Sequence, residues 1–400
     1  METYLVDWLN LLVRWLHFTA GVAWIGASLY FVMLDNSLRP PRRKEDATER
    51  GVSGELWAVH GGGFYQSQKF MAGPKGEPLS DHLHWSKWEA YTTWLSGMGL
   101  LAIVYWHGAK SLLIDPSVMD LSLTVAIAIS AGSLVVAWLV YDALCRFIRH
   151  ELTLSLIVYV LVVFAAWAYA QVFGARAAYI HTGTFIGTIM VWNVYFHIIP
   201  GQKRVVAAIR AGQPVDPQPG IIGKQRSVHN TYFTLPVLFI MISSHYPMTF
   251  GHRHAWAVLA VLILAGALIR QYFVARHRGK NLVALPSIAA VLIAGLVIAL
   301  APSSPPPSTG GADKVTYKEI EPILAQRCVA CHAAQPTFPG FVQPPAGLRL
   351  ETAAQAAAAA QKIQQQAITT QVMPPGNLTK ITDEERNKLA RWLAAGAPVQ

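Results

Sequence analysis

The stretch Leu152–Phe173, LTLSLIVYVLVVFAAWAYAQVF, contains no Asp, Glu, Lys or Arg. An apolar helix of about 20 residues is long enough to cross the hydrocarbon core of a bilayer. The whole chain shares this bias, because 53% of its 400 residues are hydrophobic, only 14% are charged and its mean hydropathy is +0.34. Soluble domains carry about 25% charged residues, so the composition predicts an integral membrane protein.

Seven other apolar segments approach the same length, and polar loops separate them. We therefore predict an all-α fold that begins with a polytopic membrane helix bundle of about eight spans. The shortest segment is Thr231–Tyr246, which also contains Pro236. The predicted spans are Trp8–Leu34, Trp88–His107, Leu121–Tyr141, Leu152–Phe173, Tyr179–Pro200, Thr231–Tyr246, Ala255–Phe273 and Leu282–Ala301.

The basic residues alternate between the two sets of loops. Most lie in the loops 35–87, 142–151, 201–230 and 274–281, whereas the alternate loops hold only Lys110, Arg176 and Arg253. Because Lys and Arg collect in cytoplasmic loops, this pattern places both termini on the outer side of the membrane. It also accounts for the net charge of +10 without nucleic acid, since no soluble segment combines a basic patch with base-stacking aromatics.

The last part of the chain has a different composition. Residues 302–311, PSSPPPSTGG, form a Pro/Ser/Gly-rich stretch that is typical of an extended tether. We predict three parts: a membrane domain of residues 1–301, this tether, and a soluble helical domain of residues 312–400. In that last part Thr382 and the acidic residues after it predict a helix start, with Leu389 and Trp392 facing inward.

The soluble part carries the motif Arg327-Cys328-Val329-Ala330-Cys331-His332. Two cysteines separated by two residues and followed by histidine are the attachment signature of c-type haem. The cysteines bind the porphyrin by thioethers, and the histidine then ligates the iron from one face. A zinc site would need a second Cys or His pair nearby, and residues 333–400 contain no further Cys or His.

A second iron ligand is expected on the opposite face of this haem. Met373 is the only methionine after the tether, and methionine opposite histidine is the arrangement of cytochromes c, in which it raises the reduction potential. We therefore predict that residues 312–400 are a small class I cytochrome c domain with covalent haem c. Haem c is attached outside the cytoplasm, in agreement with the loop charges.

Four histidines lie toward the outer ends of the predicted spans, namely His17, His107, His181 and His245. Ionisable residues in spans are costly and often functional. The first and fifth spans share a His-containing pattern, and a parallel duplication would place the four histidines in one layer. Three alternatives stay open: a haem b or another metal held by these histidines, direct substrate binding, or polar side chains at helix ends without such a role.

The first cytoplasmic loop offers two more candidates. His60 precedes the glycines 61–63, which allow close approach of the backbone to a ligand, although a flexible loop explains them equally well. Glu89 opens the second span and is a candidate proton acceptor, and Asn193 and Asn230 are further polar residues near spans.

Several long blocks resemble the bacterial membrane-bound urate hydroxylase family, in which a urate-oxidising membrane domain is fused to a C-terminal cytochrome c. The resemblance covers nearly the whole chain. The blocks are METYLVDWLNLLVRWLHFTAGVAWIGASLYFVMLDNSL (1–38), ELWAVHGGGFYQSQKF (55–70), HWSKWEAYTTWLSG (84–97), IHTGTFIGTIMVWNVYFHIIPGQ (180–202) and HNTYFTLPVLFIMISSHYP (229–247).

The resemblance implies an oxidoreductase of the bacterial inner membrane that converts urate to 5-hydroxyisourate. Electrons would pass to haem c and then to a respiratory acceptor, either a soluble cytochrome c or a terminal oxidase. Urate is an anion, so we expect a cationic donor and a general base. The candidates are Arg14, His17, His60, Glu89, His181 and His245. Two other classes stay open: a quinol–cytochrome c electron carrier, and a purine transporter with an appended cytochrome.

Overall fold

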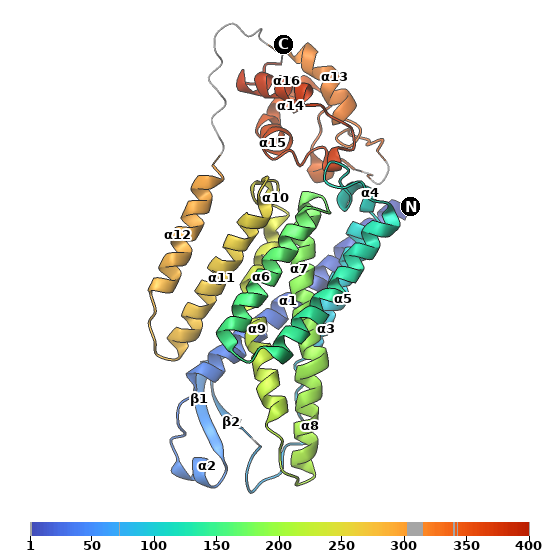
Figure 1. Cartoon of the computed structure of the whole chain (residues 1–400). Helices are drawn as coiled ribbons and strands as arrows, with labels where there is room; N and C mark the ends of the chain where they lie inside the picture. The colour runs from blue at the N-terminus through green and yellow to red at the C-terminus, as the bar shows by residue number, and fades with distance from the viewer. Residues whose placement is uncertain (1, 72, 302–314, 339–340, 342, 400) are drawn as a thin grey trace.

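The computed structural model describes residues 2–71, 73–301, 315–338, 341 and 343–399. The predicted tether, residues 302–311, lies outside these residues. The long helices run side by side in a bundle (Figure 1). They are α1 (Glu2–Ser37), α3 (Trp88–Leu100), α5 (Leu123–Phe147), α6 (Glu151–Ala170), α7 (Ala175–Trp192), α9 (Gln218–Ser243), α11 (Ala255–His277) and α12 (Ala284–Ala299).

The greater part of each predicted span is helical. Among the described residues, five helical stretches are long and apolar enough to cross a membrane: Tyr4–Ser37, Leu123–Phe147, Glu151–Ala170, Ala175–Arg210 and Ala255–His277. The helix α12 is apolar but shorter. These five candidate spans are consistent with the membrane-protein expectation, and the count of eight stays a prediction.

Two bundle helices contain a π-helical turn. The segment η1 (Leu101–Trp106) continues α3, and η2 (Asn193–Ile198) joins α7 to α8 (Ile199–Arg210). A π-helical turn inserts an extra residue into the helical ladder and is frequent at functional sites. In η2 it presents Asn193 and His197 one turn apart, toward α5 and α9.

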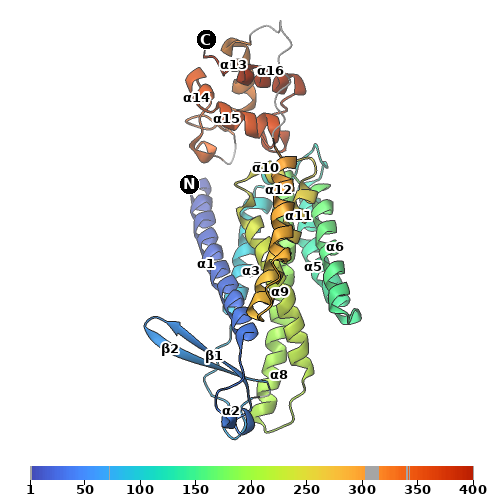
Figure 2. The ribbon, with the colours of Figure 1, turned by 90° about the vertical axis from the view of Figure 1, so that its left-hand side faces the viewer.

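The first long loop forms a β-hairpin at the far end of the bundle (Figure 2). Strands β1 (Val52–His60) and β2 (Gly63–Phe70) pair antiparallel, with His60 opposite Gly63. Gly61 and Gly62 have φ of +57° and +79°, as a two-residue hairpin turn of type I′ requires. The glycines therefore turn the chain between two strands, so this segment is an ordered hairpin and the flexible-loop alternative is wrong. A short helix, α2 (Lys44–Thr48), precedes the hairpin.

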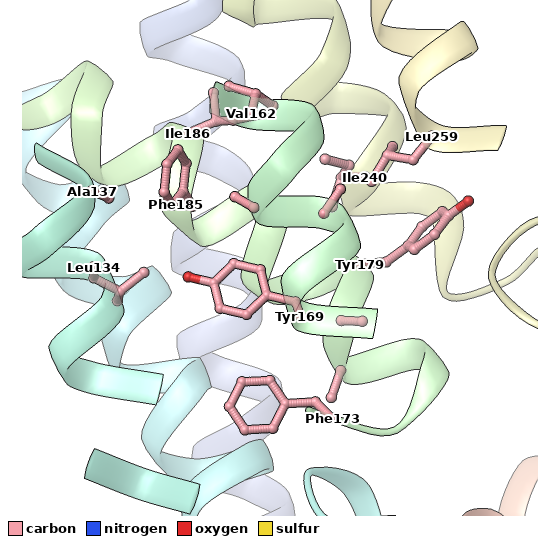
Figure 3. Packing of buried hydrophobic residues seen from close by; sticks show 14 of the residues in the cluster. Leu134, Ala137, Val162, Tyr169, Phe173, Tyr179, Phe185, Ile186, Ile240 and Leu259 are labelled. Carbon is pink, nitrogen blue, oxygen red and sulfur yellow. The ribbon is translucent and has the colours of Figure 1, made fainter. Parts of the chain in front are cut away.

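The bundle packs around one large apolar cluster. Figure 3 shows Tyr169, near the end of α6, between Leu134 and Phe185 on one side and Phe173 on the other. The rings of Tyr169 and Phe173 are stacked with centroids 5.9 Å apart. Small residues between them, such as Ala126, Ala137 and Ala177, are fully or almost fully buried, which lets α5, α6 and α7 approach closely.

The C-terminal part, residues 315–399, has its own apolar cluster built around Ile320, Leu389 and Trp392. The capping box at Thr382 and Glu385 and the burial of Leu389 and Trp392 confirm the predicted last helix. The elements are α13 (Tyr317–Arg327), η3 (Pro345–Gly347), α14 (Ala353–Ala358), α15 (Ala360–Ile363), η4 (Gln364–Thr369), η5 (Pro375–Asn377) and α16 (Asp383–Ala394). The Ala/Gln-rich stretch 352–370 forms three short helical pieces, α14, α15 and η4.

This C-terminal domain sits on the end of the bundle that also holds the N-terminus (Figures 1 and 2). Its η5 contacts α4 (Ala109–Leu112), and its η4 contacts α10 (Pro247–Phe250). The N-terminus of α1 and the C-terminal domain therefore lie at the same end of the bundle, which we call the docked end. The hairpin lies at the opposite end.

Candidate functional site

A set of buried polar side chains lies inside the bundle, between α5, the α7–η2 helix and α9. We call it the Asp142 cluster. Asp142 and Arg226 are buried charged residues, which are costly in a spanning segment and usually functional. The other members are uncharged or histidine side chains. The cluster consists of Tyr141, Asp142, Asn193, His197, Arg226, His229 and Asn230.

Asp142 is the shared acceptor of this cluster. Its Oδ1 accepts hydrogen bonds from Arg226 Nη2 and from His197 Nε2, each at 2.6 Å. Its Oδ2 pairs with Arg146 Nη2 at 2.7 Å, and the Arg146 side chain is 66% exposed. Since a carboxylate only accepts, His197 carries its proton on Nε2 and its Nδ1 is left as a base.

Amide and phenol groups surround the ion pair. Asn193 Nδ2 lies 3.0 Å from Tyr141 OH and 3.1 Å from Asn230 Oδ1, and Asn230 Nδ2 donates to Met190 O at 2.9 Å. The Arg226 guanidinium also lies over the Tyr141 ring, 5.0 Å from its centroid. These contacts fix the orientation of both amides and of the guanidinium before any ligand binds.

Buried nitrogen atoms without partners lie in and beside the cluster. Tyr141 OH lies 2.7 Å from His229 Nδ1 and accepts from Asn193 Nδ2 at 3.0 Å. Within the described part of the chain, His229 Nε2, Arg226 Nε and Trp138 Nε1 are buried without hydrogen-bond partners. Unpaired buried donors are costly, so they favour a ligand rich in acceptors.

The buried Arg226 guanidinium is available to an anion. It shares the buried carboxylate of Asp142 with the exposed Arg146, and its Nε has no partner within the described residues. The exposed Glu151 lies 3.9 Å from His229 Nε2 and offsets the charge of Arg146. Trp138, whose ring is 6.1 Å from that of His197, adds an aromatic wall on which a planar ligand can stack.

The Cys–Cys–His motif follows α13 in the C-terminal domain. Cys328 and Cys331 are free thiols, and burial raises the pKa of Cys328 to about 12. His332 Nδ1 donates to Leu348 O at 3.0 Å, which leaves Nε2 free to bind a metal. A hydrogen bond from the other ring nitrogen to a backbone carbonyl is what fixes the orientation of metal-binding histidines.

Met373 packs against the apolar cluster of the C-terminal domain. Cys328, Leu348 and Met373 all pack against it, and a cavity of about 330 Å³ is lined by Gly347, Leu348 and Arg349. Arg386 donates to Met373 O at 3.0 Å and also to Ala367 O, which anchors the methionine loop. Cys328 and Met373 both contact this cluster, and Cys331 and His332 follow Cys328 directly in the chain, so the donor set fits a covalently held haem.

The loop that carries Met373 is pressed against the membrane helices. Val372 packs on the large apolar cluster of the bundle. A Cβ built on Gly251 would lie 2.7 Å from Thr370 Cβ and 2.9 Å from Val372 Cγ1, so only glycine permits this approach. A cavity of about 110 Å³ remains at the contact and is lined by Met373, Arg176 and Asp115 among others.

The sequence profile of the family described as urate oxidase N-terminal matches residues 3–301. This match covers the whole membrane bundle, including every residue of the Asp142 cluster. The chain belongs to the urate oxidase N-terminal family. No curated protein and no solved structure matches the chain.

In this urate oxidase family member, the predicted histidine layer does not form one site. His181 is fully buried, and both of its ring nitrogens are engaged: Nδ1 donates to Ala177 O at 2.8 Å, and Nε2 accepts from Ser130 Oγ at 2.7 Å. Ser130 in turn accepts from Trp106 Nε1 at 2.9 Å. With no lone pair left over, His181 acts here as a packed structural residue.

The other three histidines of the layer are dispersed. His107 and His245 are exposed at helix ends, and no group of three His, Cys, Asp or Glu residues within the described ranges is placed to hold a metal ion. His17 is half-buried, and its Nδ1 donates to Thr93 O at 2.9 Å. Arg14 is exposed and bonds Asn10, so it does not reach a shared site with His181.

The two candidates from the first loop lie apart from the Asp142 cluster. His60 is exposed at the tip of the β-hairpin. Glu89 is partly exposed, and its Oε1 lies 4.0 Å from His84 Nε2. Neither residue bonds to a member of the cluster.

Sequence reasoning noted Asn193 and Asn230 but missed Asp142, His197, Arg226 and His229. Arg226 was counted among the basic loop residues, and Asp142 directly follows a predicted span. The available signal was Asp142, an acidic residue within one turn of a span end, together with His197 and His229 near the ends of two other spans.

Proposed function

We propose that this protein is a membrane-bound urate hydroxylase that oxidises urate to 5-hydroxyisourate and passes the electrons to haem c in its C-terminal domain. Membership of the urate oxidase N-terminal family supports the substrate. The Cys328–Cys331–His332 motif and Met373 support the electron acceptor. From there the electrons go to a soluble cytochrome c or a terminal oxidase of the respiratory chain.

One observation carries the choice of substrate site: the buried Arg226 of the Asp142 cluster has an unpaired Nε–H within the described residues, and the unpaired Trp138 Nε1 and His229 Nε2 belong to the same region. Urate is a planar monoanion at neutral pH with three carbonyl oxygens, so it supplies the acceptors that this cluster needs. We assign Arg226 to the anionic edge, Asn193 and Asn230 to the polar ring atoms, and Trp138 to the ring face.

The reaction removes two electrons and two protons from urate and adds one molecule of water. The oxygen of this water bonds to the ring carbon of the oxidised urate that carries the hydroxyl group in 5-hydroxyisourate. His197 is placed to accept a proton on Nδ1, because its Nε2–H is held by Asp142 and the carboxylate stabilises the resulting imidazolium. Burial of the cluster keeps these charge interactions strong.

Haem c, when bound, supplies a one-electron acceptor, so two transfers complete each turnover. Cys328 and Cys331 would hold it, and His332 and Met373 would ligate its iron. Leu348 O orients the imidazole, and Arg386 fixes the loop that carries the thioether. Contact of that loop with the bundle places the acceptor domain against the domain that oxidises the substrate.

We assign the docked end to the periplasmic side of the inner membrane, on the basis of the loop charges and of haem attachment outside the cytoplasm. The Asp142 cluster then lies in the cytoplasmic half. From Asn193 to the start of α7 at Ala175 is about 27 Å along the helix. This distance favours a second redox group, a haem b or a metal. Of the four histidines in the predicted layer, His17 is the candidate to hold it, because it is half-buried and its Nε2 makes no hydrogen bond within the described residues.

Anaerobic mixing of the purified haem-loaded protein with urate tests this proposal. We expect the c-type absorption bands to change to the reduced form, with two electrons taken up per urate consumed. Reduction by quinol with indifference to urate would instead identify an electron carrier. Purine uptake into vesicles without haem reduction would identify a transporter.

A further inference from the structure

A second buried arginine lies in the bundle, away from the Asp142 cluster. Arg270 of α11 is only 5% exposed. Its Nε and Nη2 are buried and have no hydrogen-bond partner, and no carboxylate pairs with it among the residues that the structure describes. A lone guanidinium held inside a spanning segment is destabilising unless something neutralises it.

The position of Arg270 follows from the packing of α11 on α9. A Cβ on Gly266, one turn before Arg270, would lie 3.3 Å from Leu235 Cβ, so this face of α11 meets α9. On the same side, Tyr232 of α9 donates its hydroxyl to Gln271. Arg226 and Asn230 of α9 bond instead to residues of α5 and α7. The two buried arginines therefore belong to different sites.

The same face of α11 continues to His277, seven residues further on. His277 Nδ1 is also buried without a partner within the described ranges. Two side chains with unpaired nitrogen atoms thus follow each other along one helix face toward the end of α11. At 1.5 Å per residue, Arg270 lies about 10 Å before that end.

A positive charge follows directly after α11. Arg278 caps the C-terminus of this helix and bonds the neutral Asn36 of α1. The adjacent carboxylate, Asp35, is taken by Lys69 of the hairpin. This end of α11 therefore attracts anions.

We propose that Arg270 is the anchor of an oxyanion-binding site between α9 and α11, with His277 as its outer group. The ligand is a phosphate group, which accepts several hydrogen bonds and matches the fork of a guanidinium. Two sources share this chemistry: the headgroup of an anionic phospholipid in the adjacent leaflet, and free inorganic phosphate. A headgroup at the end of α11 lies within reach of the long arginine side chain.

The test uses the full-length haem-loaded protein and its thermal unfolding followed by tryptophan fluorescence. Wild type, Arg270→Met and Arg276→Met are placed in nanodiscs of phosphatidylcholine, with or without phosphatidylglycerol, and in neutral detergent with or without phosphate. Arg276 is the matched control, since it is exposed and bonds only Tyr272. Ligand binding to the folded state raises Tm.

We expect a rise in Tm of several degrees for wild type and Arg276→Met, and none for Arg270→Met. A rise with phosphatidylglycerol but not with phosphate identifies a lipid site, and a rise with phosphate in detergent identifies a free oxyanion. If neither probe raises the Tm of wild type, or if Arg270→Met keeps the full rise, the proposal is overturned.

Arg270→Lys is a second variant, in case the methionine variant misfolds. It keeps the positive charge but loses the planar guanidinium group with its paired donors. It should retain part of the rise, and native mass spectrometry of the purified wild type should show a retained phospholipid in the lipid case. Neither readout depends on urate oxidation, so failure here and failure of the proposed function are separable.

Discussion

Asp142 and Arg226 form a buried ion pair between α5 and α9, with Asp142 Oδ1 and Arg226 Nη2 2.6 Å apart. The two residues are 84 positions apart in the chain. Arg226 is only 2% exposed, so its charge is poorly screened by water. The exposed Arg146 pairs with the same carboxylate, so Arg226 is able to bind a ligand.

Replacing Arg226 with Gln should lower the rate constant for haem reduction at low urate concentration by about 100-fold or more, because a buried charge partner of the anion is lost. Stopped-flow absorbance under anaerobic conditions measures this. Arg146→Gln is the matched control and should change the rate less than about threefold, since that side chain is largely exposed. Equal losses in both variants would remove Arg226 as the anion donor.

His197→Gln should separate proton transfer from binding. The amide keeps a donor for Asp142 but has no base, so we expect a fall in the maximal rate of about 100-fold or more with little change in the urate concentration at half-maximal rate. His60→Gln at the exposed hairpin tip serves as the control and should behave as wild type. A variant at position 197 with normal turnover would contradict the role of His197.

Replacing Met373 with Leu removes the expected thioether ligand but not the thioether bonds to the cysteines. We expect haem c to stay covalently attached, with a lower reduction potential and slower reduction by urate. Potentiometric titration and a haem stain on a denaturing gel measure the two properties. Met248→Leu, at an exposed methionine near the docked end, is the control. An unchanged potential would show that Met373 is not the ligand.

Val372→Asp should loosen the contact between the C-terminal domain and the bundle, because it places a carboxylate against the apolar cluster that Val372 touches. We expect haem reduction by urate to slow by at least about 10-fold, with the spectrum of the oxidised haem unchanged. Val399→Asp, at an exposed valine of the same domain, should have no such effect. A normal rate in the Val372 variant would mean that docking does not limit electron transfer.

The C-terminal domain should lose stability in acid through Glu385. Its carboxylate forms a bidentate pair with Arg327 at 2.9 and 3.0 Å, and this hydrogen bonding lowers the pKa of Glu385. The folded pKa lies below the unfolded one, so the stabilisation is complete above the unfolded pKa, near 4, and disappears as pH falls through the folded pKa.

Thermal unfolding of the haem-loaded protein between neutral pH and about pH 3 measures this effect. Glu385→Gln should be less stable at neutral pH by about 1 kcal/mol and should show a smaller further loss in acid than wild type. Glu321→Gln is the control, because that carboxylate is exposed and forms no ion pair in the described part of the chain. Parallel acid profiles for wild type and Glu385→Gln would contradict the prediction.

The apolar stretches and the haem motif could be identified from the sequence because their signals are local. A run such as Leu152–Phe173 needs only its own length and composition to form a helix in a bilayer. The capping box of Thr382 and Glu385 likewise depends on residues three apart.

The tertiary structure alone decided which polar side chains meet. The positions in the spans do not distinguish His17, His107, His181 and His245. In the structure both ring nitrogens of His181 form hydrogen bonds, with Ser130 and Ala177, whereas His107 and His245 are exposed. Asp142, His197 and Arg226 come from three separate helices. Their meeting depends on the rotation and depth of each helix, which are set by packing across the bundle and not by any neighbour along the chain.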